Sequence, residues 1–476
     1  MKIQYAIGGG MNEGQLKRIH ETALRILDEI GMQVHSEVVP DGELLERVSA
    51  HDGVRIVNGR VCFRPALVER LLKEYQAQLG PPANPQDGEL TIHTIGHACN
   101  ILDPATGKLR PCNTADLAGF ARLANTFHDE GLRGGCPGFP NDVPGPLRPV
   151  AQYKINCEHS RTRASASAES PAAAEFIYEM AKVMGYASGQ GHSVGVHPVS
   201  PLRLEGNEFD IALHFWKKLG DKLSVGCGPM PIVGVSAPIF LPGAMAQAIA
   251  EGLGCFVFFK LLTGGGAGFW FNFYAFDMKY GNFVYGGPED SLIALMRNQM
   301  NRWYGLPSHF GDKALNTMAH SADAHAATEK ASKTVIALLA GAKYLAGAGG
   351  LSLDETCSPE QLVIDMEIVR WAGRVASGFE FNDEALALEI IREAVAGGGN
   401  FLSHDSTLAH YRETYWMPQL FEHMMKSQWD EKGGRSLRER AKEIIGQRLA
   451  TECFELPEDK RMELDRIYRR AQEELG

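Results

Sequence analysis

A repeating unit of strand, turn and helix, present from about residue 113, most constrains what this 476-residue chain can fold into. Several of the helices open with proline at the first helical position, where its missing N–H costs nothing. Eight strands are expected, in the segments "LRGGCP" (132–137), "RASASAES" (163–170), "HSVGVHP" (192–198), "LSVGCGPMP" (223–231), "AGFWFNFYAF" (267–276), "SHFGDK" (308–313), "YLAGAGGL" (344–351) and "NFLSHD" (400–405). This alternation predicts an α/β protein with a (β/α)8 TIM-type barrel. A doubly wound sheet is the rival topology, because alternation alone does not separate the two.

Three regions are expected along the chain. Residues 1–112 form an N-terminal helical extension with a strand-like connector, since "LKRIHETALRILDEIGM" has helical apolar spacing and "GPPANPQDGE" (80–89) is rich in proline and glycine. Residues 113–425 form the barrel. Residues 426–476 form a C-terminal helical segment packed on it.

Charge and cysteine content narrow the function classes. The formal net charge of −11 argues against nucleic acid or an anionic membrane as the main partner. The first residues lack the apolar core of a signal peptide. The most apolar run, "GAMAQAIAEGLGCFVFFKLL", contains Glu251 and Lys260, so we expect a buried helix rather than a membrane span. Nine scattered cysteines without CxxC spacing indicate reduced thiols and a cytoplasmic location.

Aromatic side chains are concentrated in one segment, where nine of the seventeen residues from Phe269 to Tyr285 carry rings. Strand alternation would turn Phe269, Phe271 and Phe273 to one face, and Trp270, Asn272, Tyr274 and Phe276 to the other. The first set predicts core packing. The second set could form an aromatic box, because ring faces attract cations.

Familiar catalytic and metal-binding motifs are missing from the sequence. The histidine pairs 93/97 and 320/325 give neither HExxH nor CxxC patterns, so we expect no metal site. The glycine clusters 263–268 and 347–350 match no nucleotide-binding fingerprint, and there is no GxSxG elbow. In a barrel the chemistry would lie at the carboxyl ends of strands. That rule selects Cys136, Glu169, His197, Met230, Tyr274, Asp277, Asp312, Gly349 and His404.

Five longer blocks together resemble the trimethylamine methyltransferase (MttB) superfamily. They are "LKRIHETALRILDEIGMQVHSE", "GPMPIVGVSAPIFLPGAMAQAIAE", "YGGPEDSLIALMRNQMNRWYGLPSH", "AGAGGLSLDETCSPEQLVIDMEIVRW" and "GGGNFLSHDSTLAHYRETYWMPQLFEH", in the family's order over nearly the whole chain. The resemblance implies a (β/α)8 barrel that transfers a methyl group from a methylated amine to the cobalt of a separate corrinoid protein. The segment "DAHAAT" (323–328) differs from the DxHxxG signature of corrinoid-binding domains at Thr328. We therefore expect cobalamin on the partner and none bound in this chain.

The absence of pyrrolysine indicates the branch of the family. Trimethylamine-specific members carry pyrrolysine, which block order would place near "FGDKALNTM" (310–318), and only standard residues stand there. The resemblance thus implies a donor that is a quaternary amine of the glycine betaine type. Its nitrogen leaves neutral without a proton, so no catalytic acid or base is expected. The barrel need only bind, orient and desolvate the substrate.

The site residues follow from the aromatic segment and this resemblance. We expect a cage of Trp270, Tyr274, Phe276 and Tyr280, with Asn272, Glu169 and His404 as polar groups around it. His197, His309 and Lys313 are candidate partners for a substrate carboxylate. Other methylated cations (choline, a sulfonium compound, a tertiary amine) and a non-catalytic betaine-binding role stay open, as does assembly into a homo-oligomer.

Overall fold

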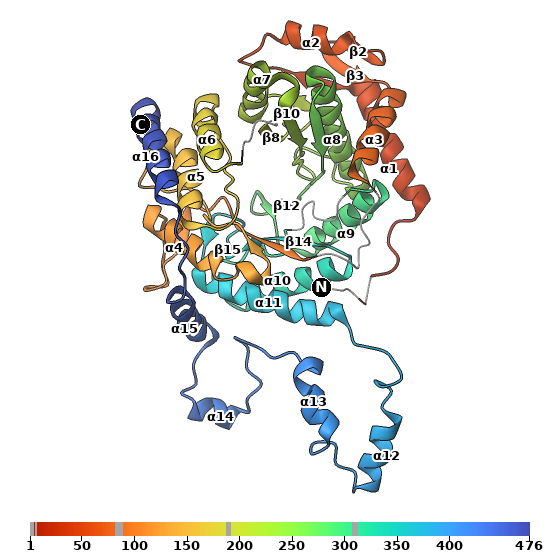
Figure 1. Ribbon diagram of the computed structural model, residues 1–476. Coiled ribbons are helices and arrows are strands. Elements are labelled where there is room, and N and C mark those ends of the chain that lie inside the picture. The colour runs from red at the N-terminus through yellow and green to blue at the C-terminus, as the bar shows by residue number, and fades with distance from the viewer. Residues whose placement is uncertain (1–3, 5–6, 81–88, 187–191, 307–312) are drawn as a thin grey trace.

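The computed structural model describes residue 4 and residues 7–80, 89–186, 192–306 and 313–476. Two three-stranded parallel sheets lie at its centre, with helices around them (Figure 1). In one sheet β4 (Thr91–Thr94) lies between β14 (Tyr344–Ala348) and β7 (Leu132–Arg133). In the other, β10 (Leu223–Cys227) lies between β8 (His192–Val196) and β11 (Gly266–Phe269). The predicted α/β class is confirmed.

Smaller sheets extend this centre. An N-terminal sheet has the order β2 (Val54–Val57), β3 (Arg60–Phe63), β1 (Met32–Val34) and β9 (Arg203–Leu204). A second has the order β15 (Gly350–Leu351), β16 (Thr356–Cys357), β5 (Asn100–Leu102) and β6 (Leu109–Pro111). A hairpin pairs β12 (Ala275–Asp277) with β13 (Asn282–Val284).

The α-helices make up most of the outer layer. They are α1 (Glu13–Arg25), α2 (Asp41–Ser49), α3 (Pro65–Leu79), α4 (Thr114–Asn125), α5 (Arg148–His159), α6 (Pro171–Val183), α7 (Asn207–Leu219), α8 (Leu241–Thr263), α9 (Pro288–Trp303), α10 (Ala324–Leu339), α11 (Pro359–Ser377), α12 (Leu388–Ala396), α13 (Asp405–Thr414), α14 (Lys426–Glu431), α15 (Leu437–Leu449) and α16 (Glu458–Leu475). A π-helical turn, η1 (Ile26–Ile30), continues α1. Three 3₁₀ turns are η2 (His128–Glu130), η3 (Gly145–Leu147) and η4 (Gly220–Lys222).

Strand β4 belongs to the expected N-terminal extension, and its neighbours β14 and β7 belong to the expected barrel. Strand pairing therefore crosses the expected boundary at residue 112. The three-region division itself stays a prediction. In the C-terminal region α16 packs against α5 and α6, and α15 packs against α11.

Two of the predicted strands are wrong. Residues 163–168 are irregular up to the Ser170 cap of α6, because alternating alanine and serine have little apolar area to bury in a sheet. Residues 400–404 form a turn leading into α13, whose N-cap is His404, and none of the described strands pairs with them. The segment 267–276 is a strand only at its two ends. The segment 308–313 falls outside the described residues except for Lys313.

Helix α8 is the most apolar helix that the structure describes. By length and composition it could cross a membrane, but most of it is buried inside the protein. The expectation of a buried core helix is confirmed. Its faces pack on α1 and on the β8–β10–β11 sheet, in the largest hydrophobic cluster.

A buried ion pair joins α10 to α11. Lys330 Nζ donates to Asp365 Oδ2 at 2.7 Å, and both side chains are fully buried. Asp365 also accepts hydrogen bonds from the Gly349 N–H (2.7 Å) and from Gln361 Nε2 (2.8 Å). Burial lowers the pKa of Lys330 and raises that of Asp365, and the charge of each group opposes this effect on the other.

Replacing Lys330 with methionine is expected to lower the free energy of unfolding by about 3–5 kcal/mol, because Asp365 is left as an unpaired buried charge. Chemical denaturation measures the loss. The double variant Lys330→Met/Asp365→Leu is the control and should recover much of it. A single variant as stable as the wild type would contradict the burial of this pair.

Candidate functional site

The two faces of the β8–β10–β11 sheet differ in the size of their side chains. Val196, Cys227 and Phe269 form a cross-strand row on the face that packs on the helices. On the opposite face the registered rows are Ser193–Ser224–Gly266 and Gly195–Gly226–Gly268. That face therefore carries almost no side-chain volume, and the side chains just beyond the strand ends can lie over it.

Trp270 lies over this small-residue face. A Cβ atom on Gly228 would stand 2.0–2.2 Å from atoms of the Trp270 indole, and one on Gly226 would stand 2.9 Å from it. The indole thus rests directly on glycine backbone. The His197 ring, which follows β8, meets Trp270 edge to face with 5.8 Å between ring centroids.

His197 is fixed by Glu208 near the start of α7. Glu208 Oε2 accepts the His197 backbone N–H at 2.8 Å and lies 2.7 Å from His197 Nδ1. Burial by itself raises the pKa of Glu208, but the hydrogen bonds and charge of His197 lower the pKa overall. Glu208 is therefore ionised at neutral pH, and it leaves His197 Nε2 free of this contact.

Lys313 is held by two tyrosines. Its Nζ donates to Tyr285 Oη at 2.7 Å and lies 4.6 Å and 5.3 Å from the ring centroids of Tyr285 and Tyr274. Burial disfavours its charge, but the two tyrosines and Asp354 raise the pKa of Lys313 overall. The lysine stays cationic and already occupies the faces of these rings.

The charged groups described above and Asp354 all act on the pKa of His97. This histidine follows β4, and its ring lies 6.3 Å from that of Phe139. The ring keeps contact with solvent, yet the surrounding protein desolvates it and lowers its pKa. The charges of Lys313 and His197 lower the pKa of His97 further, while Asp354 and Glu208 raise it, so all four groups lie near this ring.

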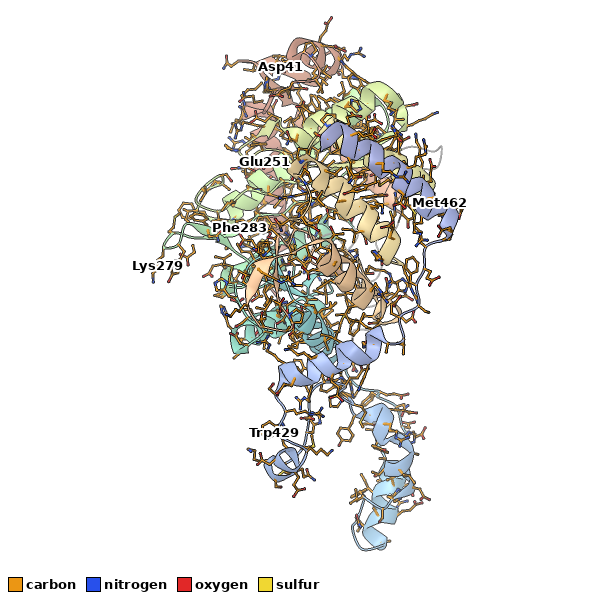
Figure 2. All side chains as sticks on the ribbon, turned by 90° about the vertical axis from the view of Figure 1, so that its left-hand side faces the viewer. Asp41, Glu251, Lys279, Phe283, Trp429 and Met462 are labelled. Carbon is orange, nitrogen blue, oxygen red and sulfur yellow. The ribbon has the colours of Figure 1, made fainter. Side chains whose placement is uncertain are left out.

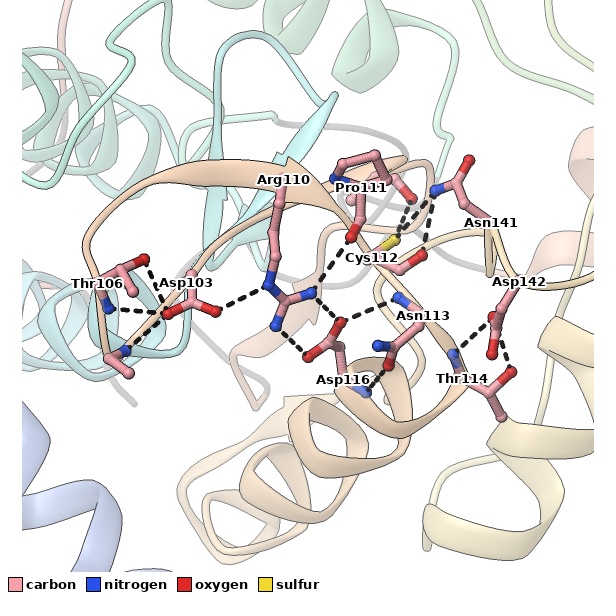
Figure 3. Close-up of polar contacts among 12 residues, drawn as sticks. Asp103, Thr106, Arg110, Pro111, Cys112, Asn113, Thr114, Asp116, Asn141 and Asp142 are labelled. Carbon is pink, nitrogen blue, oxygen red and sulfur yellow. Dashed lines mark hydrogen bonds and ion pairs between the residues drawn. The ribbon is translucent and has the colours of Figure 1, made fainter.

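A polar cluster around Arg110 and Asp116 lies next to the loop that carries Phe139 (Figure 3). Arg110 bonds Asp103 Oδ2 at 2.8 Å and both carboxylate oxygens of Asp116 at 2.6 and 2.8 Å, which ties the β5–β6 hairpin to the start of α4. Nearby, the Phe139 N–H donates to the Ala98 carbonyl at 2.9 Å. A Cβ on Gly138 would overlap that carbonyl at 1.8 Å, so only glycine permits this close approach.

Of the expected site residues, His197 contacts Trp270, and Lys313 lies beside Tyr274. The charges of both His197 and Lys313 act on His97, which connects the two pairs. Asn272 is buried and accepts a hydrogen bond from Arg297 at 2.7 Å. Phe276 pairs with Phe283 across the β12–β13 hairpin. As expected, Phe269, Phe271 and Phe273 are core residues.

Other expected residues lie elsewhere. Tyr280 is 75% exposed in the hairpin turn beside Lys279, which Figure 2 shows at the tip of a projecting loop. Glu169 is exposed just before α6. His404 caps α13, on a segment that projects from the body of the protein (Figure 1). His309 falls outside the described residues.

Four residues of the site were absent from the expected set: His97, Glu208, Tyr285 and Asp354. Its position gave a signal for His97, because a histidine three residues past the parallel strand β4 stands at the same edge as His197. Asp354 stands in no motif that would have selected it. Glu208 gave no signal, since its role depends on how α7 packs against β8.

Among the residues that the structure describes, no three His, Cys, Asp or Glu side chains gather as a metal site. What converges beyond the carboxyl ends of parallel strands is one lysine, two histidines, two carboxylates and several aromatic rings. Charged, polar and aromatic groups in one place are typical of sites for small charged molecules. Polar groups at the carboxyl ends of parallel strands are typical of α/β enzymes that act on small molecules.

Comparison with known proteins assigns the family. The model described as trimethylamine methyltransferase (MTTB) matches residues 4–476, so the chain belongs to that family, as the sequence blocks predicted. It is 26% identical to the glycine betaine methyltransferase of Desulfitobacterium hafniense (strain Y51), with 88% of each chain covered. It is 25% identical to the trimethylamine methyltransferase MttB of Desulfitobacterium hafniense (strain DSM 10664 / DCB-2), over 98% of this chain and 95% of that protein.

Trp270→Ala is expected to cost only about 1–2 kcal/mol of unfolding free energy, because the half-buried indole rests on backbone rather than in the core. Phe269→Ala, one residue earlier and 1% exposed, is the matched control and should cost about 3–5 kcal/mol. Urea denaturation measures both. Equal losses would place Trp270 in the core.

Gly228→Ala tests the position of the Trp270 indole by changing the glycine on which it rests. The added methyl group would overlap the indole, so Trp270 must move and its fluorescence emission should shift. Gly195→Ala, on the same face with open space at its Cβ position, is the control and should leave the emission unchanged. An unshifted emission in Gly228→Ala would show that the indole does not rest there.

Proposed function

We propose that this protein is a methyltransferase that moves a methyl group from a glycine betaine-like quaternary amine to the cob(I)alamin of a separate corrinoid protein. Family membership and the named activities of its relatives support methyl transfer from an amine. The glycine betaine methyltransferase, whose similarity spans most of both chains, supports the choice of a quaternary amine. Only standard residues stand where the family resemblance would place pyrrolysine.

The observation that carries the choice of substrate is the cationic Lys313 in the same site as Trp270. A betaine has both charges, so its carboxylate can face the Lys313 ammonium while its methylated nitrogen lies against aromatic rings. Choline and trimethylamine lack the carboxylate, and the lysine would repel a purely cationic ligand. The second candidate, transfer from another methylated cation, is disfavoured on this ground.

The proposed methyl transfer requires little of the protein beyond binding and orienting the substrate. The acceptor's electron pair forms a bond to the methyl carbon as the carbon–nitrogen bond breaks, and that bond's pair returns to nitrogen. The amine leaves neutral, so no side chain transfers a proton to it. Trp270 and His197 would orient the ammonium, Lys313 the carboxylate, and the anionic Glu208 and Asp354 would offset the positive charge.

The corrinoid protein must reach the substrate from the side where the strands end. The loop after β10 and the β12–β13 hairpin expose Val235, Ile239, Phe240 and Met278 there. Gly234, Ile239 and Met278 are close neighbours, so the two loops form one apolar surface. We propose that the corrinoid protein docks on this surface, in the cytoplasm, and that the cobalamin belongs to it.

We also propose that the two parallel sheets are arcs of one (β/α)8 barrel. Residues 163–168 would lie between β7 and β8, and residues near 313–317 between β11 and β14. The hydrogen bond from the Leu315 N–H to the Ala346 carbonyl, 3.1 Å long, supports the second position. Helices on one face of each sheet fit the same architecture.

A thermal-shift comparison of glycine betaine, choline and trimethylamine tests the substrate. Glycine betaine should raise the melting temperature most, since about a hundredfold excess over its Kd adds roughly 2.7 kcal/mol to stability. Methyl transfer to reduced corrinoid protein then separates an enzyme from a betaine-binding protein. Stabilisation by choline alone would contradict the proposed role of Lys313, and binding without turnover would favour the binding protein.

Lys313→Met should weaken glycine betaine binding by about 10- to 100-fold, which corresponds to the loss of one charge-assisted hydrogen bond. Calorimetric titration measures the Kd, and circular dichroism confirms that the variant is folded. Lys279→Met, on the exposed hairpin tip, is the matched control and should bind normally. If both variants bind like the wild type, Lys313 does not contact the carboxylate.

A further inference from the structure

A long segment between α11 and α15 projects from the body of the protein, as Figures 1 and 2 show from two directions. We call residues 379–418 the arm; it contains α12 and α13. Its root is fixed on α11, where Glu367 Oε1 accepts the backbone N–H groups of Gln419, Leu420 and Phe421 at 2.8–3.1 Å. Arg374 Nη2 donates to the Thr414 carbonyl at 2.7 Å. The arm is therefore anchored at its base rather than loosely attached.

The arm's helices are too short to be stable in water on their own. Helices α12 and α13 have 9 and 10 residues, and isolated helices shorter than about 12–15 residues are marginal. Within one chain, Ala394 is the buried residue of α12 and α13 has none. Packing within one chain therefore contributes little to the stability of these helices.

Helix α12 has an exposed apolar face, and α13 has one exposed leucine. Leu388, Ile391 and Val395 share a face of α12 at 64%, 46% and 65% exposure, and Leu408 of α13 is 75% exposed. Further exposed apolar residues of the arm are Phe381, Leu386, Phe401, Leu402, Tyr415 and Met417. Monomeric proteins rarely leave a surface of this kind in contact with water.

The charge and position of the arm narrow the choice of partner. Its seven carboxylates face only two arginines, which disfavours nucleic acid and anionic membranes. It projects away from the two parallel sheets, so a corrinoid protein bound there could not reach the site. Its 40 residues are enough to supply one side of a standard protein interface, which has about 20–30 residues.

We propose that the arm packs against a second copy of this chain and that the protein is a homo-oligomer held together by it. In a two-fold arrangement the arm of each copy contacts the other copy. One sequence segment then provides both halves of the contact. The exposed Trp371 and Val375, one turn apart on α11 beside the arm's root, continue the apolar surface onto the body. This inference does not depend on the proposed reaction.

Light scattering coupled to size exclusion tests the proposal on the full-length chain. The wild type should have at least twice the 52.1 kDa mass of one chain. The double variant Leu388→Glu/Leu408→Glu should fall to the mass of a single chain. The matched control Leu109→Glu/Met462→Glu changes residues that are 58% and 59% exposed on the body, and it should keep the wild-type mass.

Hydrogen exchange distinguishes loss of the interface from unfolding. In the wild type the amides of α12 and α13 should be protected, and in the arm variant they should exchange fast while α8 stays protected. A wild type that runs as a single chain at every concentration would overturn the proposal. So would an arm variant that keeps the oligomeric mass.

Discussion

Two buried lysines on α10 fix the loops on which the rest of the site depends. Lys330 pairs with Asp365, which in turn holds the backbone N–H of Gly349 beyond β14. Lys333, one turn later, donates to the carbonyl of Tyr285 and pairs with Asp290 at 2.6 Å. Leaving either charge unpaired in the interior would cost several kcal/mol, so both loops are held in one position. The tyrosine that holds Lys313 is placed in this way.

The site combines an open sheet face with balanced charge. The serine and glycine rows of β8, β10 and β11 leave space that Trp270 partly fills. Around that space lie the cationic Lys313 and the acids Glu208 and Asp354, with His97 near all three. A zwitterion suits such a site, because each of its charges meets an opposite one. The protein's own lysine already occupies the faces of two tyrosines, so the proposal assigns the methylated nitrogen to Trp270.

Sequence reasoning found the parts of the site that follow from local pattern. His197 and Trp270 stand just beyond strands whose apolar alternation is visible in the chain, and the rule of strand ends selected His197. The same rule failed for Glu169 and His404, because residues 163–168 and 400–404 are not strands. Tyr280 was included because it is aromatic, but a two-stranded hairpin carries it to an exposed turn.

The sequence by itself determined the α/β class, the buried character of α8, the core face of residues 269–273 and the family. Each of these follows either from short-range periodicity or from blocks of residues. Neither kind of signal requires knowledge of contacts between distant parts of the chain. Only the tertiary structure decided which side chains meet. His97 lies near Asp354, and Lys313 bonds Tyr285, because of how strands and helices far apart in the chain pack together. Such pairings depend on the whole folded core, which local periodicity does not encode.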